Sequence, residues 1–191
     1  GLEMSNLYGG RPLYGRESRV HRYAWAVPDD AALRIIAKHA PIVEIGAGTG
    51  YWAALLRARG VDIVAYDKDP PDGGEGHPFH AARRAWTDVA VGGPEKAAEH
   101  PDRTLFLCWP PYDDPMAADC LREYRGDVVI YVGEGKHGCT ADDTFHDMLA
   151  ADWHLVRAHS IPQWAGVHDR LFVYRRGPAP DAAPDAGETE E

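Results

Sequence analysis

The sequence predicts an α/β fold: a Rossmann-like, doubly wound sheet, mostly parallel with an antiparallel last strand, and helices on both faces. Short continuous apolar runs are typical of strands that are covered on both faces. Helical patterns separate these runs, as in a sheet built from β-α-β units. Two strand-like segments close the pattern as an antiparallel pair. The four apolar runs are residues 41–45, 62–67, 104–108 and 127–132.

Length and composition predict one folded domain with two flanking segments. The 191 residues are 45% hydrophobic and 26% charged, which is ordinary for a globular protein that buries a single core. We expect an N-terminal arm or lid over 1–28, a ligand-binding domain over 29–176 and a tail over 177–191. The tail holds five acidic residues, no basic residue and much Pro and Ala, a composition that predicts disorder.

The first half of the domain reads as a helix followed by a β-α-β unit. After Pro28 a helix is expected from Asp29 or Asp30, because acidic residues favour a helix N-terminus. The strand 41–45 runs into a glycine loop, and a helix of about ten residues then ends at Gly60.

The second half is less regular at its start. Residues 70–78 are rich in Pro and Gly and predict a loop. Further elements are expected in this order: a short helix, a faint strand, two helices that flank the strand 104–108, a helix after the strand 127–132, and the closing antiparallel strands. Their approximate ranges are 79–85, 86–91, 93–100, 118–124, 140–150, 153–161 and 170–175.

Charge and cysteine content restrict the functions that we consider. The net charge is −10, and the body stays acidic without the tail, which weighs against nucleic-acid binding. No apolar run is long enough to span a membrane. Three cysteines without a CxxC pair fit a reducing cytoplasm. The arginine-rich segment 11–22 is either a solvated face or flexible arm, or a clamp for an anionic substrate.

The glycine loop after the first strand indicates a nucleoside ligand without a pyrophosphate. A phosphate-binding P-loop would need GxxxxGK[ST], which is absent. In the dinucleotide pattern GxGxxG the third glycine would stand where Tyr51 is, whereas this loop has Gly46, Gly48 and Gly50. Asp67 closes the second strand 21 residues after Gly46, where a carboxylate can bind both hydroxyls of a ribose. The alternative for the loop alone is a tight β-α turn.

The segments VEIGAGTG and YD resemble the paired motifs of class I S-adenosylmethionine-dependent methyltransferases. The resemblance implies a seven-stranded sheet with the cofactor over the carboxyl ends of the first and fourth strands. It also implies a methionine pocket shaped by the loop, a ribose held by Asp67, and an adenine near the end of the third strand. The residues expected to contact the cofactor in these motifs are Glu44, Gly46, Ala47, Gly48, Gly50, Asp67, Lys68, Asp88 and Val89.

The stretch LCWPPY after the fourth strand is similar to the Asn/Asp-Pro-Pro-Tyr motif of amino-methyltransferases. Trp109 replaces the polar residue of that motif and has only a donor, so its side chain cannot accept a hydrogen from a target amine. We expect Trp109 and Tyr112 to form a stacking wall for the acceptor, and both could attract the sulfonium by cation–π interaction. The alternative is a Pro-Pro turn with two aromatics in the core.

Other candidate site residues lie on two further segments. Glu134 and His137 follow the fifth strand and are candidate bases, with a surface-loop histidine as the alternative for His137. Tyr23 and Trp25 precede the domain and would either cover the cofactor or pack in the core. Histidine and cysteine spacing predicts no metal site.

The sequence therefore predicts an S-adenosylmethionine-dependent methyltransferase for a small molecule or peptide side chain, through O- or N-methylation, including natural-product tailoring. Two alternatives stay open: a nucleic-acid amino-methyltransferase, and a protein that binds S-adenosylmethionine without methyl transfer. The oligomeric state cannot be read from the sequence.

Overall fold

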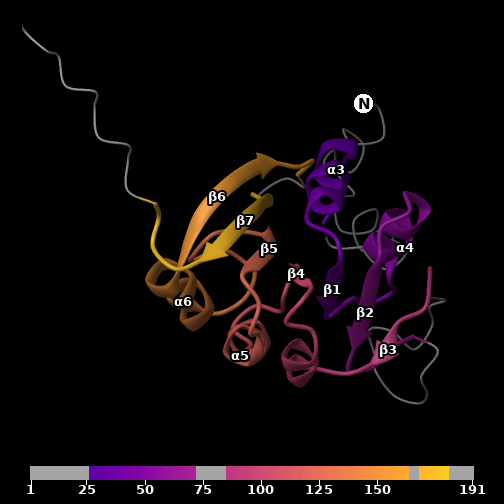
Figure 1. The fold of residues 1–191 in the computed structure, drawn as a ribbon, viewed down its shortest axis with the longest axis horizontal. Helices are drawn as coiled ribbons and strands as arrows, with labels where there is room; N and C mark the ends of the chain where they lie inside the picture. The colour runs from indigo at the N-terminus through magenta and orange to yellow at the C-terminus, as the bar shows by residue number, and fades with distance from the viewer. Residues whose placement is uncertain (1–25, 72–84, 164–167, 181–191) are drawn as a thin grey trace, which may run out of the picture.

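The computed structural model describes residues 26–71, 85–163 and 168–180. In these residues seven strands form one sheet in the order β3-β2-β1-β4-β5-β7-β6 (Figure 1). Neighbouring strands from β3 to β5 are parallel, whereas β7 is antiparallel to both β5 and β6. The predicted fold class, including the closing antiparallel pair, is confirmed.

The first β-α-β unit follows the sequence prediction closely. It contains β1 (Ile42–Ile45), α4 (Tyr51–Ala58) and β2 (Ile63–Asp67), and α3 (Asp30–Lys38) precedes it. Gly60 has a φ of 79° after the end of α4, the left-handed conformation that ends many helices.

The second half contains the remaining strands and helices. Their bounds are β3 (Ala90–Val91), η1 (Pro94–Glu99), β4 (Thr104–Cys108), α5 (Met116–Glu123), β5 (Val128–Gly133), α6 (Asp143–Asp152), β6 (Trp153–Ser160) and β7 (Arg170–Arg176). Among the described segments, no helix has the length and apolar character needed to cross a membrane.

Two predicted elements differ from the structure. The strand expected over 86–91 is reduced to Ala90–Val91, and these two residues pair with the end of β2. Asp88 and Val89, which lay inside the expected strand, consequently precede β3. The helix expected over 93–100 is a 3₁₀-helix, and the one expected over 79–85 falls almost entirely outside the described residues.

Two hydrophobic clusters cover the two faces of the sheet (Figure 1). Residues of α3 and α4 pack on one face against Ile42, Phe106 and Ile130. Residues of α5 and α6 pack on the other face against Val43 and Leu105. Because side chains alternate along a strand, Glu44 shares the α3–α4 face with Ile42.

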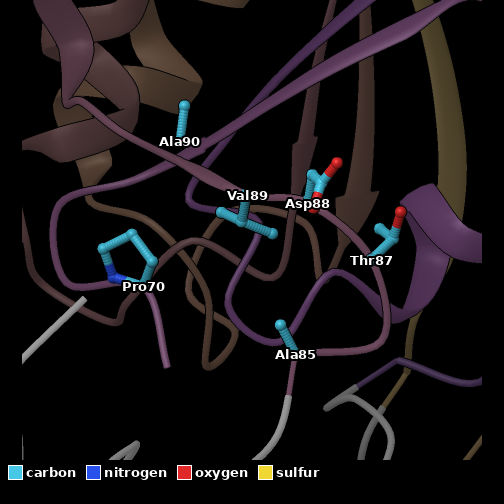
Figure 2. A pocket seen from close by; sticks show the side chains of 6 residues that line it. All are labelled: Pro70, Ala85, Thr87, Asp88, Val89 and Ala90. Atoms are coloured by element: carbon cyan, nitrogen blue, oxygen red, sulfur yellow. The ribbon is translucent and has the colours of Figure 1, made fainter. Parts of the chain in front are cut away.

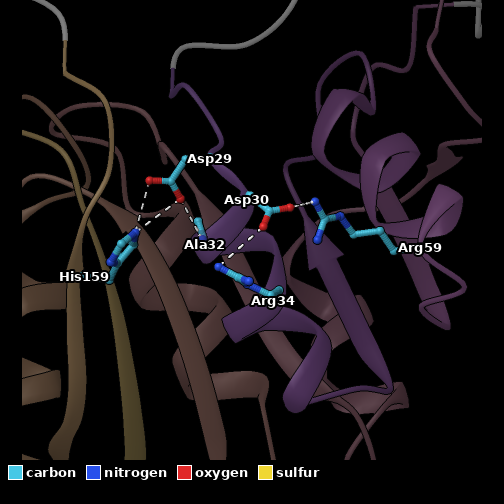
Figure 3. Close-up of polar contacts among 6 residues, drawn as sticks. All are labelled: Asp29, Asp30, Ala32, Arg34, Arg59 and His159. Atoms are coloured by element: carbon cyan, nitrogen blue, oxygen red, sulfur yellow. Dashed lines mark hydrogen bonds and ion pairs between the residues drawn. The ribbon is translucent and has the colours of Figure 1, made fainter.

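Polar contacts tie the start of α3 to both of its neighbours (Figure 3). Asp29 caps the helix by accepting the Ala32 N–H at 2.7 Å, and its carboxyl lies 3.2 Å from His159 Nε2 on β6. Asp30 pairs with Arg59 just after α4. These contacts hold the start of α3 between β6 and the end of α4.

Candidate functional site

The glycine loop connects β1 to α4 in a conformation that favours glycine. Gly46, Gly48 and Gly50 have φ values of 78°, 59° and 78°, which lie in the left-handed region. The N–H groups of Gly46 and Ala47 both donate to the Tyr66 carbonyl, each at 2.9 Å. This anchors the loop to the end of β2.

Close packing adds a second reason for glycine in this loop. A Cβ at Gly46 would lie 2.5 Å from the terminal methyl of Met116, and one at Gly50 would lie 2.9 Å from a methyl of Val89. The loop is therefore confined on the α5 side and on the side of residues 87–89. This narrow backbone surface suits a ligand that approaches the main chain closely.

Asp67 lies at the carboxyl end of β2 and faces the glycine loop. Its side chain is buried, and it accepts the Gly48 N–H at Oδ2 and the Asp69 N–H at Oδ1, each at 2.9 Å. A carboxylate offers about four acceptor positions, so two remain for a diol. Lys68, the next residue, is exposed.

Glu44 is a buried acid beneath the same loop. Burial and, to a smaller extent, the nearby Asp67 raise its pKa to about 8, while Arg57 acts in the opposite direction. Among the described residues its Oε2 has no hydrogen-bond partner. A buried acceptor of this kind is costly unless a ligand or another donor satisfies it. The loop, Asp67 and Glu44 thus fit the methionine and ribose parts of S-adenosylmethionine.

A cavity of about 280 Å³ lies beside the end of β2 and the segment that precedes β3. Figure 2 shows Pro70 facing Val89 across it, while Thr87 and Asp88 point away from Pro70. Pro70, Val89 and two alanines give it a largely apolar lining, which suits a planar ring. Asp88 and Val89, predicted for the adenine, both line this cavity.

Arg57 of α4 fixes the wall of this cavity. Its guanidinium donates to the Thr87 hydroxyl at 2.7 Å, to the Asp88 carbonyl at 2.8 Å and to the Ile63 carbonyl at 2.9 Å. The Trp86 N–H also donates to the Thr49 carbonyl of the glycine loop at 2.8 Å. The segment before β3 is thereby held against both the loop and α4.

Trp109 lies directly after β4 in an unusual conformation. Its φ of 51° is rare for a bulky residue and often marks a functional site. The backbone N–H donates to the Val132 carbonyl at 2.7 Å, and the indole Nε1–H donates to Asp169 Oδ1 at 2.7 Å. The ring packs against the same cluster as Ala47 of the glycine loop.

Tyr112, the other predicted aromatic, is 69% exposed. It stands on a turn that is tied to the loop after β5, since the Ala141 N–H donates to the Pro110 carbonyl and the Asp113 N–H donates to the Ala141 carbonyl, each at 3.0 Å. Packing of Tyr112 in the core, the alternative given above, does not occur. Tyr112 is free to contact a ligand at the surface.

Glu134 and His137 occupy different environments on the loop after β5. Glu134 is buried, and its Oε1 accepts the Cys139 N–H at 3.4 Å. The Tyr131 hydroxyl contacts the Glu134 carbonyl and Thr140, which holds the loop closed. The His137 side chain is 78% exposed, and its Nδ1 lies 4.0 Å from Asp143.

Some predictions cannot be placed. Tyr23 and Trp25, the arginine-rich segment 11–22 and the tail beyond residue 180 lie outside the described residues. Within the described ranges, no group of three or more His, Cys, Asp or Glu side chains is arranged to hold a metal ion.

Sequence reasoning missed Asp169 and Arg57. Asp169 is fully buried and binds an indole sixty residues away, and no local pattern marks such a contact. Arg57 resembles an ordinary basic residue in the last turn of a helix. Each residue has only a weak signal in the sequence: Asp169 directly precedes an apolar strand, and Arg57 interrupts an apolar helix.

Comparison with solved structures identifies the fold. A Streptococcus pneumoniae protein assigned as a tRNA (m1A22) methyltransferase has a TM-score of 0.52 at 14% identity, over 82% of this chain and 74% of its own. Magnesium protoporphyrin IX methyltransferase from Synechocystis, with bound S-adenosylmethionine, has a TM-score of 0.51 at 8% identity, over 90% and 94%. The Burkholderia thailandensis 1,6-didemethyltoxoflavin-N1-methyltransferase, with bound S-adenosylhomocysteine, has 0.50 at 17% identity, over 91% and 85%.

These similarities cover most of the chain and most of each neighbour. No model of a protein family matches the sequence, and no curated protein matches it significantly. The chain has the fold of the class I S-adenosylmethionine-dependent methyltransferases.

Proposed function

We propose that this chain is an S-adenosylmethionine-dependent methyltransferase that acts on a small molecule or a peptide side chain, at oxygen or nitrogen. The observation that carries the proposal is the pair of buried acids at the glycine loop. Asp67 accepts the Gly48 N–H, and Glu44 has an Oε2 without a partner among the described residues. An acid at the loop and an acid at the end of the next strand suit a ligand with a ribose and a cationic amino acid part.

Each part of the cofactor has candidate contacts on the chain. The glycine loop, including Ala47, and Glu44 would hold the methionine part. Asp67 would hold the ribose, with Lys68 beside it. The cavity lined by Asp88 and Val89 would take the adenine. When bound, the cofactor supplies an electrophilic methyl group on a positively charged sulfur.

The acceptor side supports a target that is recognised by stacking. The only polar atom of the Trp109 side chain donates to Asp169, so it cannot orient a target amine as the polar residue of the Asn/Asp-Pro-Pro-Tyr motif does. Tyr112 extends the aromatic wall at the surface. Correct alignment of the nucleophile with the methyl group supplies much of the rate enhancement in such a reaction.

Two candidate bases lie on the neighbouring loop. His137 is exposed and could accept a proton from a hydroxyl or a charged amine. Glu134 is buried and bonded to its own loop, so it would first have to lose the contact with the Cys139 N–H. We favour His137 as the base where the acceptor needs one.

A nucleic-acid methyltransferase is the second candidate, because Pro110, Pro111 and Tyr112 retain part of the amino-methyltransferase motif. The exposed charges near the turn weigh against a polyanion: Asp113 and Asp143 are exposed acids, and Lys136 is paired with Asp147 at 2.7 Å. The mildly acidic composition points in the same direction.

The proposal also places the enzyme in the cytoplasm. Cys108, Cys120 and Cys139 are not joined in disulfide bonds, as expected in a reducing compartment.

Calorimetry tests cofactor binding directly. We expect S-adenosylmethionine and S-adenosylhomocysteine to bind at low micromolar strength, about −7 to −8 kcal/mol. Binding of a nicotinamide dinucleotide instead of either compound would contradict the proposal.

Incubation with methyl-labelled cofactor, a small-molecule extract, peptides and oligonucleotides then separates the acceptor classes. If no fraction acquires label, the chain binds the cofactor without transferring its methyl group.

A further inference from the structure

The contact between Trp109 and Asp169 has a chemical feature that a structural anchor would not need. Asp169 lies directly before β7 and is fully buried, and the indole Nε1–H donates to its Oδ1 at 2.7 Å. An indole N–H can be satisfied by a neutral oxygen, such as a backbone carbonyl. In this molecule Trp52 is satisfied in that way by the Ala26 carbonyl at 3.3 Å. A buried carboxyl group costs more to desolvate than a carbonyl does.

The main chain at Asp169 is also held in place by a polar contact. Gln163 Nε2 donates to the Asp169 backbone carbonyl at 3.0 Å and so fixes the main chain next to the carboxyl group. Cys108 lies on the same face, and its pKa is raised by burial first and then by the negative charges of Glu44 and Asp169. Four acidic side chains are buried at or near the carboxyl edge of the sheet: Glu44, Asp67, Glu134 and Asp169.

Strand register places Trp109 opposite the glycine loop. Strands β1 and β4 are adjacent and parallel, with Glu44 paired with Phe106. Ala47 and Trp109 each lie three residues beyond this pair, and both pack against the same cluster. The carboxyl ends of these two strands flank the position where ligands bind in doubly wound sheets.

We infer that Asp169 positions the Trp109 indole and makes its ring electron-rich, so that the wall of the site binds the cationic methyl sulfonium in preference to the neutral thioether. A hydrogen bond to a carboxylate draws negative charge toward the ring, and the π face attracts cations. Asp169 acts through Trp109 and is a positioning residue.

This inference rests on the proposed function and gives the aromatic wall a specific task. In methyl transfer the acceptor forms a bond to the methyl carbon, and the S–CH₃ bond breaks with its electron pair moving to sulfur. The proton of a protonated acceptor leaves to a base. The cofactor product is therefore neutral at sulfur. A wall that favours the cation releases the product more easily than the substrate.

The test compares the affinities of two cofactor forms and needs no acceptor. Calorimetry gives Kd for S-adenosylmethionine and for S-adenosylhomocysteine, and the ratio of the two cancels their shared contacts. We expect Trp109→Leu to shift this ratio about tenfold toward S-adenosylhomocysteine, equivalent to about 1.4 kcal/mol. Asp169→Asn keeps an oxygen acceptor but removes the charge, and we expect a shift of about threefold in the same direction.

A double-mutant cycle separates this role from a general effect on packing. Trp109→Phe keeps an aromatic face but removes the Nε1 donor, so Asp169→Asn should no longer change the ratio in that background. Trp153→Phe is the matched control, because Trp153 packs in the cluster on the opposite face, and its ratio should equal that of the wild type. Should Trp109→Leu fail to fold, the Asp169→Asn and Trp109→Phe variants suffice.

The outcomes distinguish this inference from the proposed function. If neither compound binds the wild-type chain, the proposed function fails, and the inference fails with it. If both bind and the ratio is the same in every variant, the proposed cofactor binding stands and the inference is wrong. If Trp109→Leu shifts the ratio but Asp169→Asn does not, the role assigned to Asp169 is wrong.

Discussion

The proposed cofactor side and the proposed acceptor side of this site are built in different ways. The proposed cofactor side consists of a backbone loop and two acids at or near adjacent strand ends, all within residues 44–67, with bonds such as that from the Gly48 N–H to Asp67. The acceptor side depends on long-range contacts, such as Trp109 to Asp169 and Pro110 to Ala141. We expect substitutions on the first side to alter cofactor affinity or stability, and substitutions on the second side to alter discrimination and methyl transfer.

The largest expected effect concerns Glu44 and the pH dependence of stability. Its pKa is raised from 4.5 to about 8 in the folded protein, so between these values the folded state holds a proton that the unfolded state has lost. The contribution of Glu44 to the free energy of unfolding is fully present below about pH 4.5 and is lost as the pH rises toward 8. Glu44→Gln stays neutral, so its stability relative to the wild type should rise by about 1.4 kcal/mol for each pH unit in this window.

Urea unfolding of both proteins at pH 5, 6.5 and 8 measures this difference, in which the other titrating groups cancel. Parallel profiles would mean that the pKa of Glu44 is not raised in the folded protein.

The second effect tests the confinement of the glycine loop. Gly50→Ala adds a Cβ at a φ of 78°, 2.9 Å from a methyl of Val89, whereas Gly60→Ala has nearly the same φ of 79° and no atom within 4 Å. Left-handed strain costs about 1–2 kcal/mol in both variants. The clash should add about 1–3 kcal/mol of lost stability in Gly50→Ala alone, and calorimetry should show lost cofactor binding only there. Equal losses would mean that Val89 moves freely.

The third effect concerns the proposed ribose contact. Asp67→Ala should weaken cofactor binding by about 1–3 kcal/mol, because it removes a charge-assisted acceptor and the bond to the Gly48 N–H. Asp69→Ala is the control, since its backbone N–H, which donates to Asp67, is retained. Equal losses in calorimetry would show that the ribose does not depend on Asp67 in particular.

The difference between the two sides also explains what the sequence could predict. The glycine loop and Asp67 were predictable because each stands at a fixed distance from an apolar strand, and parallel strands bring these ends together. The short length of β3 was not predictable, because it depends on pairing with the end of β2 and not on its own residues. The role of Asp169 was not predictable, because Asp169 reaches Trp109 only when β7 lies between β5 and β6 in the folded sheet. The strained Trp109 backbone likewise has no sequence signal.

The smallest effect on stability, and the sharpest test of the acceptor side, is expected for Tyr112→Ala. The side chain is 69% exposed, so the free energy of unfolding should change by no more than about 0.5 kcal/mol. Cofactor affinity should also stay unchanged, because Tyr112 follows the prolines and lies farther along the turn than Trp109. Lost stacking of the acceptor is worth about 1–3 kcal/mol, or roughly a 5- to 150-fold loss of methyl transfer. Transfer of labelled methyl to the product found with the wild type measures this loss. A lower affinity for S-adenosylmethionine with unchanged transfer at saturating cofactor would place Tyr112 on the cofactor side and remove the division between the two halves.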